Sequence, residues 1–327
     1  QQGVVTGVSN QEWTTVQLDR EYRSMVVVAT ANYDSNSVPL VVHVSNAQGS
    51  SFDVRVHRAD ASTATVPGVP VHYMVVEEGV YNDVDHGVKM EAVKFTSSVT
   101  DEDGSWVGEK RTYANSYTNP VVVGQVMSYN DADWSAFWSH GGTRTDPPSS
   151  SNLYVGKNVA EDPDTTRAAE TIGYIVIEAG SGFISGIGYV AALGDDTVLG
   201  VDDSPPYTYN HGGLDSGASA IVCQAGMDGS NGGWALLYGS NPVSDTSLNL
   251  AVDEDRLRDP ERNHTHEQVA YFVFGGPPPP TPTATSTATA TSTPSNTPTP
   301  SNTPTPSNTP TPSNTPTSTP TPSNTPT

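Results

Sequence analysis

Residues 72–77 read HYMVVE, and the same pattern returns at residues 173–178 (GYIVIE) and at residues 270–274 (AYFVF). A tyrosine occupies the second place in each stretch, and β-branched or aromatic side chains follow it. Short runs of this composition are typical of β-strands. Because the pattern returns at a regular distance along the chain, it also indicates an internal repeat.

Three more strand patterns repeat in the same order before each HYMVVE-like stretch. They are a Val-rich run, a run with large apolar residues and an alternating run. The runs are residues 25–29, 120–124 and 220–224; residues 40–44, 134–138 and 234–238; and residues 51–56, 152–157 and 248–253. Four landmarks in one order predict three copies of one unit.

The predicted fold is all-β, because the apolar runs are short and are bounded by Gly, Asn, Asp and Pro. Each copy has the size of a small two-sheet sandwich. We therefore expect three tandem antiparallel β-sandwich modules, followed by an extended polyproline-II tail of Thr, Ser and Pro. The predicted boundaries are residues 1–86, 87–182, 183–276 and 277–327.

The tail, residues 277–327, contains no charged or aromatic side chain and no Leu, Ile or Val. The hexapeptide SNTPTP begins at Ser295, Ser301 and Ser307. Proline fixes φ and lacks an amide donor, which excludes helix and sheet ladder and leaves polyproline II. Thr and Ser beside Pro are typical of O-glycosylated, mucin-like stalks. The candidate O-glycosylation sites are Thr293, Ser295, Thr297, Thr299, Ser301, Thr303, Thr305, Ser307, Thr309, Thr311, Ser313 and Thr315.

Acidic residues dominate the charge of the chain, with 36 Asp and Glu against 14 Lys and Arg and a formal net charge of −22. This balance argues against nucleic acid as a partner, because phosphate binding needs Lys and Arg. No apolar stretch is long enough to span a membrane. The chain begins at Gln1, which we interpret as a mature terminus left by signal-peptide removal. We expect a secreted protein at the cell surface, with Cys223 as a core residue.

Acidic clusters are the candidate metal sites. Calcium prefers six to eight oxygen ligands, which loops rich in Asp supply. The alternative for each cluster is a solvated turn, and no cofactor is required under that interpretation. The candidate calcium ligands are Asp101, Asp103, Asp202, Asp203, Asp253 and Asp255.

Trp134, Trp138 and Trp234 are the candidate residues for a carbohydrate platform, and core packing is the alternative. Asn263 lies in the sequence Asn-His-Thr, which fits the N-glycosylation sequon. No nucleophile elbow, phosphate-binding loop or His-Glu-x-x-His motif occurs in the chain. We therefore predict that the protein is not an enzyme.

The first copy resembles the H-type lectin family in residues 40–46 (LVVHVSN), 51–56 (SFDVRV) and 71–77 (VHYMVVE). The resemblance extends over residues 12–80 and weakens in the two later copies. It implies a six-stranded antiparallel sandwich that binds galactose-type sugars and often trimerises.

We expect a secreted structural glycoprotein, a subunit of an extracellular fibre or surface appendage that self-assembles into a homopolymer. Covalent glycans would decorate its tail. One alternative is a lectin-like adhesion protein displayed on a stalk, with a polysaccharide as ligand. A second alternative is a non-catalytic accessory region of a secreted polysaccharide-active enzyme.

Overall fold

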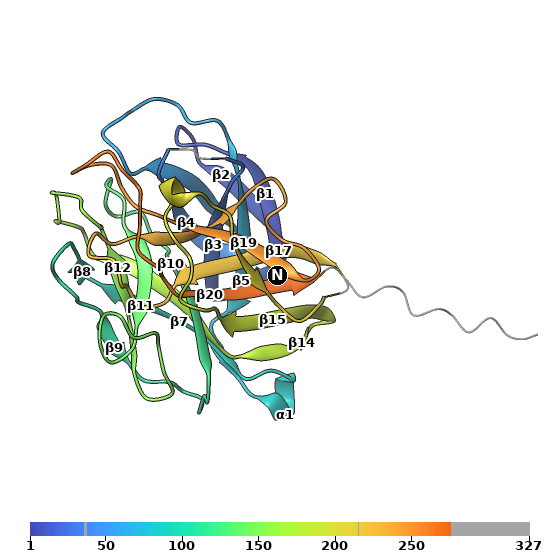
Figure 1. Ribbon diagram of the computed structural model, residues 1–327. Coiled ribbons are helices and arrows are strands. Elements are labelled where there is room, and N and C mark those ends of the chain that lie inside the picture. The colour runs from blue at the N-terminus through green and yellow to red at the C-terminus, as the bar shows by residue number, and fades with distance from the viewer. Residues whose placement is uncertain (36–37, 215, 276–327) are drawn as a thin grey trace, which may run out of the picture. The chain divides into compact units, whose positions relative to one another are not determined.

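The computed structural model describes residues 1–35, 38–214 and 216–275 (Figure 1). The chain divides into two units, Gln1–Thr281 and Pro282–Thr327. The predicted polyproline-II tail and all of its candidate O-glycosylation sites lie outside the described residues. No helix among those described is long and apolar enough to cross a membrane.

Strands dominate the described residues, which also contain one short α-helix and one 3-10 helix. The elements are β1 (Gln2–Val8), β2 (Thr14–Tyr22), β3 (Met25–Tyr33), β4 (Leu40–Arg58), β5 (Val69–Glu77), β6 (Gly79–Tyr81), α1 (Asp83–His86), β7 (Met90–Ser97), β8 (Thr100–Asp101), β9 (Glu109–Arg111), β10 (Pro120–Val126), β11 (Ala136–His140), β12 (Leu153–Asn158), β13 (Glu170–Glu178), β14 (Gly180–Ile184), β15 (Ile187–Leu193), η1 (Val201–Asp203), β16 (Tyr207–Asn210), β17 (Gly217–Gln224), β18 (Trp234–Tyr238), β19 (Ser247–Asp253) and β20 (Val269–Gly275). The prediction of an all-β fold is confirmed.

One antiparallel arrangement of three strands occurs in each third of the described chain. The HYMVVE-like strand lies in the middle, and the Val-rich strand pairs with one side of it. The first long strand of the same third (β1, β7 or β15) pairs with the other side. The three arrangements are β1-β5-β3, β7-β13-β10 and β15-β20-β17. In the second and third, a further strand covers the outer edge: β6 pairs with β7, and β14 pairs with β15.

The remaining strands form a second recurring arrangement. The alternating strand pairs with a preceding strand in β2–β4, β9–β12 and β16–β19, and with the large-residue strand in β12–β11 and β19–β18. In the first third, β4 contains both runs. The backbone N–H of Ala59 donates to the carbonyl of Pro39, so the two ends of β4 meet and the strand folds back on itself. Asn46 and Gly49 supply the positive φ angles of that turn.

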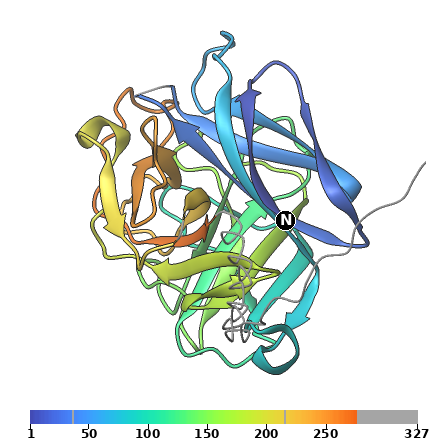
Figure 2. The same ribbon diagram turned by 90° about the vertical axis from the view of Figure 1, so that its right-hand side faces the viewer.

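The Val-rich strands β3, β10 and β17 contact one another in all three pairs. Each also contacts the middle strand of a different third: β3 meets β13, β10 meets β20 and β17 meets β5. Figure 2 shows the blue, green and orange parts of the chain side by side around this junction. One hydrophobic core draws on all three thirds, with Val27, Val122 and Ile221 among its members.

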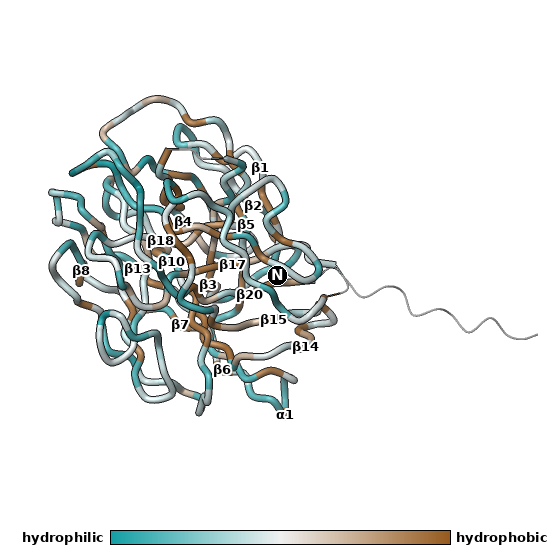
Figure 3. The backbone as a smooth tube through the Cα atoms, in the orientation of Figure 1, coloured by the Kyte–Doolittle hydropathy of each residue, from teal (hydrophilic) through white to brown (hydrophobic). Residues whose placement is uncertain are grey.

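Burial on both faces explains why these strands are nearly continuous apolar runs rather than alternating ones. Every residue of β3 and of β10 is buried. Figure 3 shows the apolar colour along these strands and the polar colour on the loops. Gly124 interrupts the valines of β10 because the Phe137 ring lies against it; an added Cβ would stand 2.3 Å from that ring.

Every strand predicted from the four repeated patterns overlaps an observed strand. The predicted boundary between residues 182 and 183 falls inside β14, which pairs with β15 in the segment that follows. Moreover, β18 pairs in parallel with β3, which joins the last third of the described chain to the first. The division into three modules at these boundaries stays a prediction.

Cys223 lies on β17 and is buried, as the sequence predicts for a core residue. Its Sγ accepts a hydrogen bond of 3.3 Å from the backbone N–H of Gly124 on β10. Burial raises the pKa of the thiol to about 12. Cys223 therefore acts as a small apolar residue at the junction of the Val-rich strands.

Candidate functional site

The three predicted carbohydrate-binding tryptophans lie in the interior. Trp134, Trp138 and Trp234 are 3%, 0% and 8% exposed. The rings of Trp134 and Trp234 meet edge to face, with centroids 5.4 Å apart, and Trp138 stacks on His140. A sugar platform needs an exposed ring face, so the structure corrects this prediction in favour of core packing.

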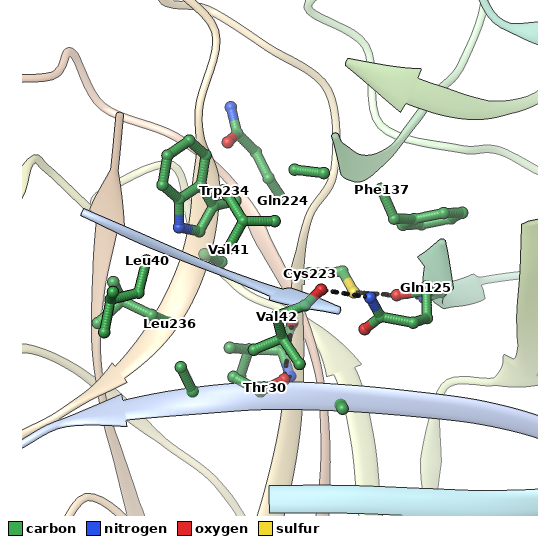
Figure 4. A pocket seen from close by; sticks show the side chains of 16 residues that line it. Thr30, Leu40, Val41, Val42, Gln125, Phe137, Cys223, Gln224, Trp234 and Leu236 are labelled. Carbon is green, nitrogen blue, oxygen red and sulfur yellow. Dashed lines mark hydrogen bonds between the residues drawn. The ribbon is translucent and has the colours of Figure 1, made fainter. Parts of the chain in front are cut away.

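A small cavity lies beside Trp234, where the three Val-rich strands meet (Figure 4). Thr30 of β3, Gln125 of β10 and Gln224 of β17 line it. Thr30 accepts from the N–H of Val222, and the Gln125 amide donates to the Val42 carbonyl over 2.9 Å. The cavity measures about 50 Å³, far below the several hundred Å³ of small-molecule sites. Thr30 and Gln125 therefore connect strands, and the cavity is too small to hold a sugar.

Asp253, a predicted calcium ligand, lies in a buried ion pair with Arg262. Both side chains are fully buried, and Arg262 Nε donates to Asp253 Oδ1 over 2.6 Å. Tyr33 of β3 donates its hydroxyl to Asp253 Oδ2 over 2.7 Å. The carboxylate thus joins the first and last thirds of the described chain.

Asp202 and Asp203 hold the loop that contains Arg262. Asp202 Oδ2 accepts from the backbone N–H of Arg262 over 3.1 Å and lies 3.7 Å from the Arg256 guanidinium. Asp203 Oδ2 accepts from the backbone N–H groups of Gly200 and His264. Both acids therefore bind backbone amides of the same chain, and Asp202 also lies beside a cation.

The other predicted calcium ligands are used in the same way. Asp101 accepts from the Ser105 hydroxyl and the Val107 N–H, Asp103 pairs with Arg258, and Asp255 accepts from the N–H groups of Glu161 and Leu257. Burial raises the pKa of Asp101 and that of Asp255 to about 6. Across the described ranges, no three His, Cys, Asp or Glu side chains form a group able to hold a metal ion.

His264 lies between two buried carboxylates. Its Nδ1 is 3.0 Å from Glu254 Oε2, and its Nε2 is 2.9 Å from Glu267 Oε1. Glu267 also accepts from the N–H groups of Asp228 and Gly229. Burial alone would lower the pKa of His264, but the two hydrogen-bonded carboxylates raise it to about 9. The imidazole is therefore a buried cation that fixes this loop.

Asn263 is exposed between the buried Arg262 and His264. Its backbone N–H donates to Glu261. Its side chain is thus open to solvent at the place where a glycan would be attached, and N-glycosylation stays a prediction.

A half-exposed cluster of aromatic rings around Arg55 was not predicted. The guanidinium lies 4.8 Å from the centroid of Trp13 and 4.5 Å from that of Tyr129, and it donates to the Tyr129 hydroxyl over 2.6 Å. His43 packs on His57 beside Tyr129, and burial, followed by neighbouring positive charge, lowers the pKa of both imidazoles. We name this set, residues 13, 43, 55, 57 and 129, the Arg55 cluster.

The pairing register of β2 with β4 explains why Trp13 lies beside Arg55. Thr14 pairs with Val54 and Thr15 with Asp53, so the same register places Trp13 opposite Arg55. Tyr129 comes from the loop after β10, and no pattern in the sequence connects it with β4.

A larger groove of about 620 Å³ lies where the middle strands β5 and β20 end. Met74, Tyr81, Met90, Ile187 and Phe274 line it, with Asp19 and Arg20 among the polar lining residues. Its volume is in the range of small-molecule sites. None of the predicted site residues lines it.

Halomucin of Haloquadratum walsbyi (strain DSM 16790 / HBSQ001) is 25% identical to this chain over 276 residues. The alignment covers 80% of this chain and 3% of halomucin, so the chain spans a small fraction of that protein's length. No family model matches the chain, and no solved structure matches it.

Proposed function

We propose that this chain is a non-enzymatic structural glycoprotein of the extracellular surface, a fibre or appendage subunit with an O-glycosylated Thr/Ser/Pro stalk. The observation that carries the proposal is the composition of residues 277–327, since Thr and Ser beside Pro in a segment without charged or large apolar residues is typical of mucin-like stalks. The similarity to halomucin, whose name is formed on mucin, supports the same interpretation.

The folded part of this proposal is a head of three related six-stranded sandwich units. The two recurring strand arrangements support it, and so does the cyclic order in which each Val-rich strand meets the middle strand of another third. A head with one shared core resists separation of its units, which suits a mechanical or protective role. The resemblance to H-type lectins fits this architecture.

Intact-mass analysis of the protein from its native source tests the proposal. We expect a series of hexose- or pentose-sized additions on the peptide that contains residues 293–315, because every second or third residue there carries a hydroxyl beside proline. Peptides of the head other than the one with Asn263 are the internal control. A tail peptide of unmodified mass would contradict the proposal.

A carbohydrate-binding function is the second candidate, and the Arg55 cluster favours it. Half-exposed Trp and Tyr faces with a guanidinium between them combine apolar surface with hydrogen-bond donors, which is the chemistry of a sugar platform. Asp133 lines a small cavity together with His43 and Tyr129 and adds an acceptor there.

Glycan-array binding of the wild type and Trp13→Ala tests this candidate. We expect Trp13→Ala to weaken binding by about fivefold or more, because a stacked ring contributes on the order of 1 kcal/mol or more. Trp106→Ala is the matched control, since Trp106 is also half-exposed and has Arg144 3.7 Å from its ring centroid. Equal losses in both variants, or no binding by the wild type, would exclude the Arg55 cluster as a sugar site.

A further inference from the structure

Strand β1 is the outermost strand of its sheet. Its inner side pairs with β5, and no strand among the described residues pairs with its outer side. The equivalent strands β7 and β15 differ, because β6 and β14 cover their outer sides with antiparallel ladders. The outer side of β1 therefore lacks, among the described residues, the covering strand that β7 and β15 both have.

The register shows which backbone groups face the open side. Gln1 and Val75 exchange two hydrogen bonds, of 2.8 Å from the terminal nitrogen and 2.7 Å to the Gln1 carbonyl. Gln2 is opposite Met74 and Gly3 is opposite Tyr73. Since hydrogen-bonded and non-hydrogen-bonded pairs alternate in antiparallel ladders, the N–H and C=O groups of Gln2 and Val4 point outward.

Strand β1 lacks charge and proline, two of the usual protections of an edge, and its bulge or irregularity lies between Val5 and Val8, beyond Gln2 and Val4. Its sequence, QGVVTGV, contains no Lys, Asp, Glu or Pro, and the Val4 side chain is 42% exposed. Residues 71–76 of the neighbouring β5 carry no charge either, because burial lowers the pKa of His72 to about 4. Edge segments without charge or proline, such as residues 2–5, accept strands from other chains.

The charge of the chain and the prolines of its tail together indicate which strand pairs with the outer side of β1. The chain has a formal net charge of −22, so two copies repel each other over most of their surfaces, but an approach through β1 brings uncharged strands together. In the first two thirds, a covering strand follows the middle strand: β6 follows β5, and β14 follows β13. The sequence that follows β20 contains proline at residues 277–280 instead. Proline has no amide proton to donate to a ladder.

We propose that β1 pairs antiparallel with β1 of a second copy, so that the two outer sheets continue across a twofold axis. An isologous contact of this kind joins the folded parts of two chains into a dimer. This dimer would be the first step of the self-assembly that we propose for the fibre subunit. The inference rests on the proposed function only in the choice of a second copy of the chain as the partner of β1.

Sedimentation velocity of the full chain over a range of micromolar concentrations tests the inference. We expect dimers for the wild type and at least a tenfold weaker dimer for Val4→Lys, because a lysine at the centre of the edge places two like charges opposite each other. Val80→Lys is the matched control: Val80 is an exposed valine (51%) on the edge strand β6, and this variant should dimerise like the wild type. Unchanged melting temperatures show that both variants fold.

Hydrogen exchange supplies a second measurement that needs no substitution. The amides of Gln2 and Val4 should become protected as concentration rises, whereas the amide of Val80 should not change. A monomeric wild type, a Val4→Lys variant that dimerises normally, or an equal loss in Val80→Lys would overturn the inference. The glycan masses on residues 293–315 are independent of these results, so a monomeric protein with a glycosylated tail would remove the β1 contact alone.

Discussion

Replacing Arg262 by methionine is expected to lower the free energy of unfolding by about 3–5 kcal/mol. The Asp253 carboxylate, fully buried, would lose its guanidinium partner at 2.6 Å and keep the Tyr33 hydroxyl and the backbone amide of Glu254. An uncompensated buried charge is costly because the interior solvates it poorly. Urea denaturation of the two proteins at neutral pH measures the difference.

Arg258→Met is the matched control for this substitution. Arg258 also pairs with an aspartate, Asp103, but its side chain is 51% exposed. Surface pairs contribute about 0–1 kcal/mol, so the control should remain close to the wild type. Combining Arg262→Met with Asp253→Asn should restore part of the lost stability, since the buried charge is then removed as well. A loss below about 1 kcal/mol for Arg262→Met would contradict the buried-pair interpretation.

The order of strands could be predicted because local patterns determine it. The stretches that contain Tyr73, Tyr174 and Tyr271 form β5, β13 and β20, each in the middle of a three-strand arrangement. Their β-branched and aromatic side chains favour extended backbone wherever both faces are covered. Repetition made these assignments secure, since three independent stretches had to agree.

Contacts between the thirds could not be predicted in the same way. The parallel pairing of β18 with β3 joins Leu237 to Asn32, and no periodicity relates those two residues. The tryptophans illustrate the same limit, because the repeat aligns Trp234 with Trp134 but does not show that the two rings pack against each other. Burial of each ring depends on a neighbour from another third.

The acidic candidates failed to form a common site for a related reason. A run of aspartates provides oxygen ligands, but the partner of each carboxylate comes from a distant loop. Asp253 meets Arg262 and Tyr33, and Asp103 meets Arg258. A sequence with 14 Lys and Arg among 36 acids does not reveal which few acids take those cations. Whether an aspartate forms an ion pair or could bind a metal therefore depends on which side chains the folded loops place beside it.

The free energy of unfolding is expected to fall by about 3 kcal/mol between pH 6.5 and pH 9 through His264 alone. Hydrogen bonds to Glu254 and Glu267 raise the pKa of His264 to about 9 in the folded state, against 6.5 for the ordinary side chain. A raised pKa means that the folded state binds the proton more tightly. The stabilisation is therefore complete below pH 6.5 and is lost as the pH rises through 9.

Other groups act in the same range, so the prediction is a difference between proteins. Burial raises the pKa of Glu254 to about 7, which adds to the loss, whereas burial lowers the pKa of the Gln1 ammonium to about 6, which opposes it. We expect His264→Gln to show a much flatter fall from pH 6.5 to pH 9, because neither state then gains or loses this proton.

The exposed neighbour supplies the control for this titration. His266→Gln changes an imidazole two residues away that is open to solvent, and it should keep the full wild-type slope. If His264→Gln is too unstable to fold, the imidazole of His264 in the wild type can be followed by NMR and should remain charged above pH 8. Titration of that imidazole near pH 6.5, or equal slopes in all three proteins, would show that the two carboxylates do not hold His264 as a buried cation.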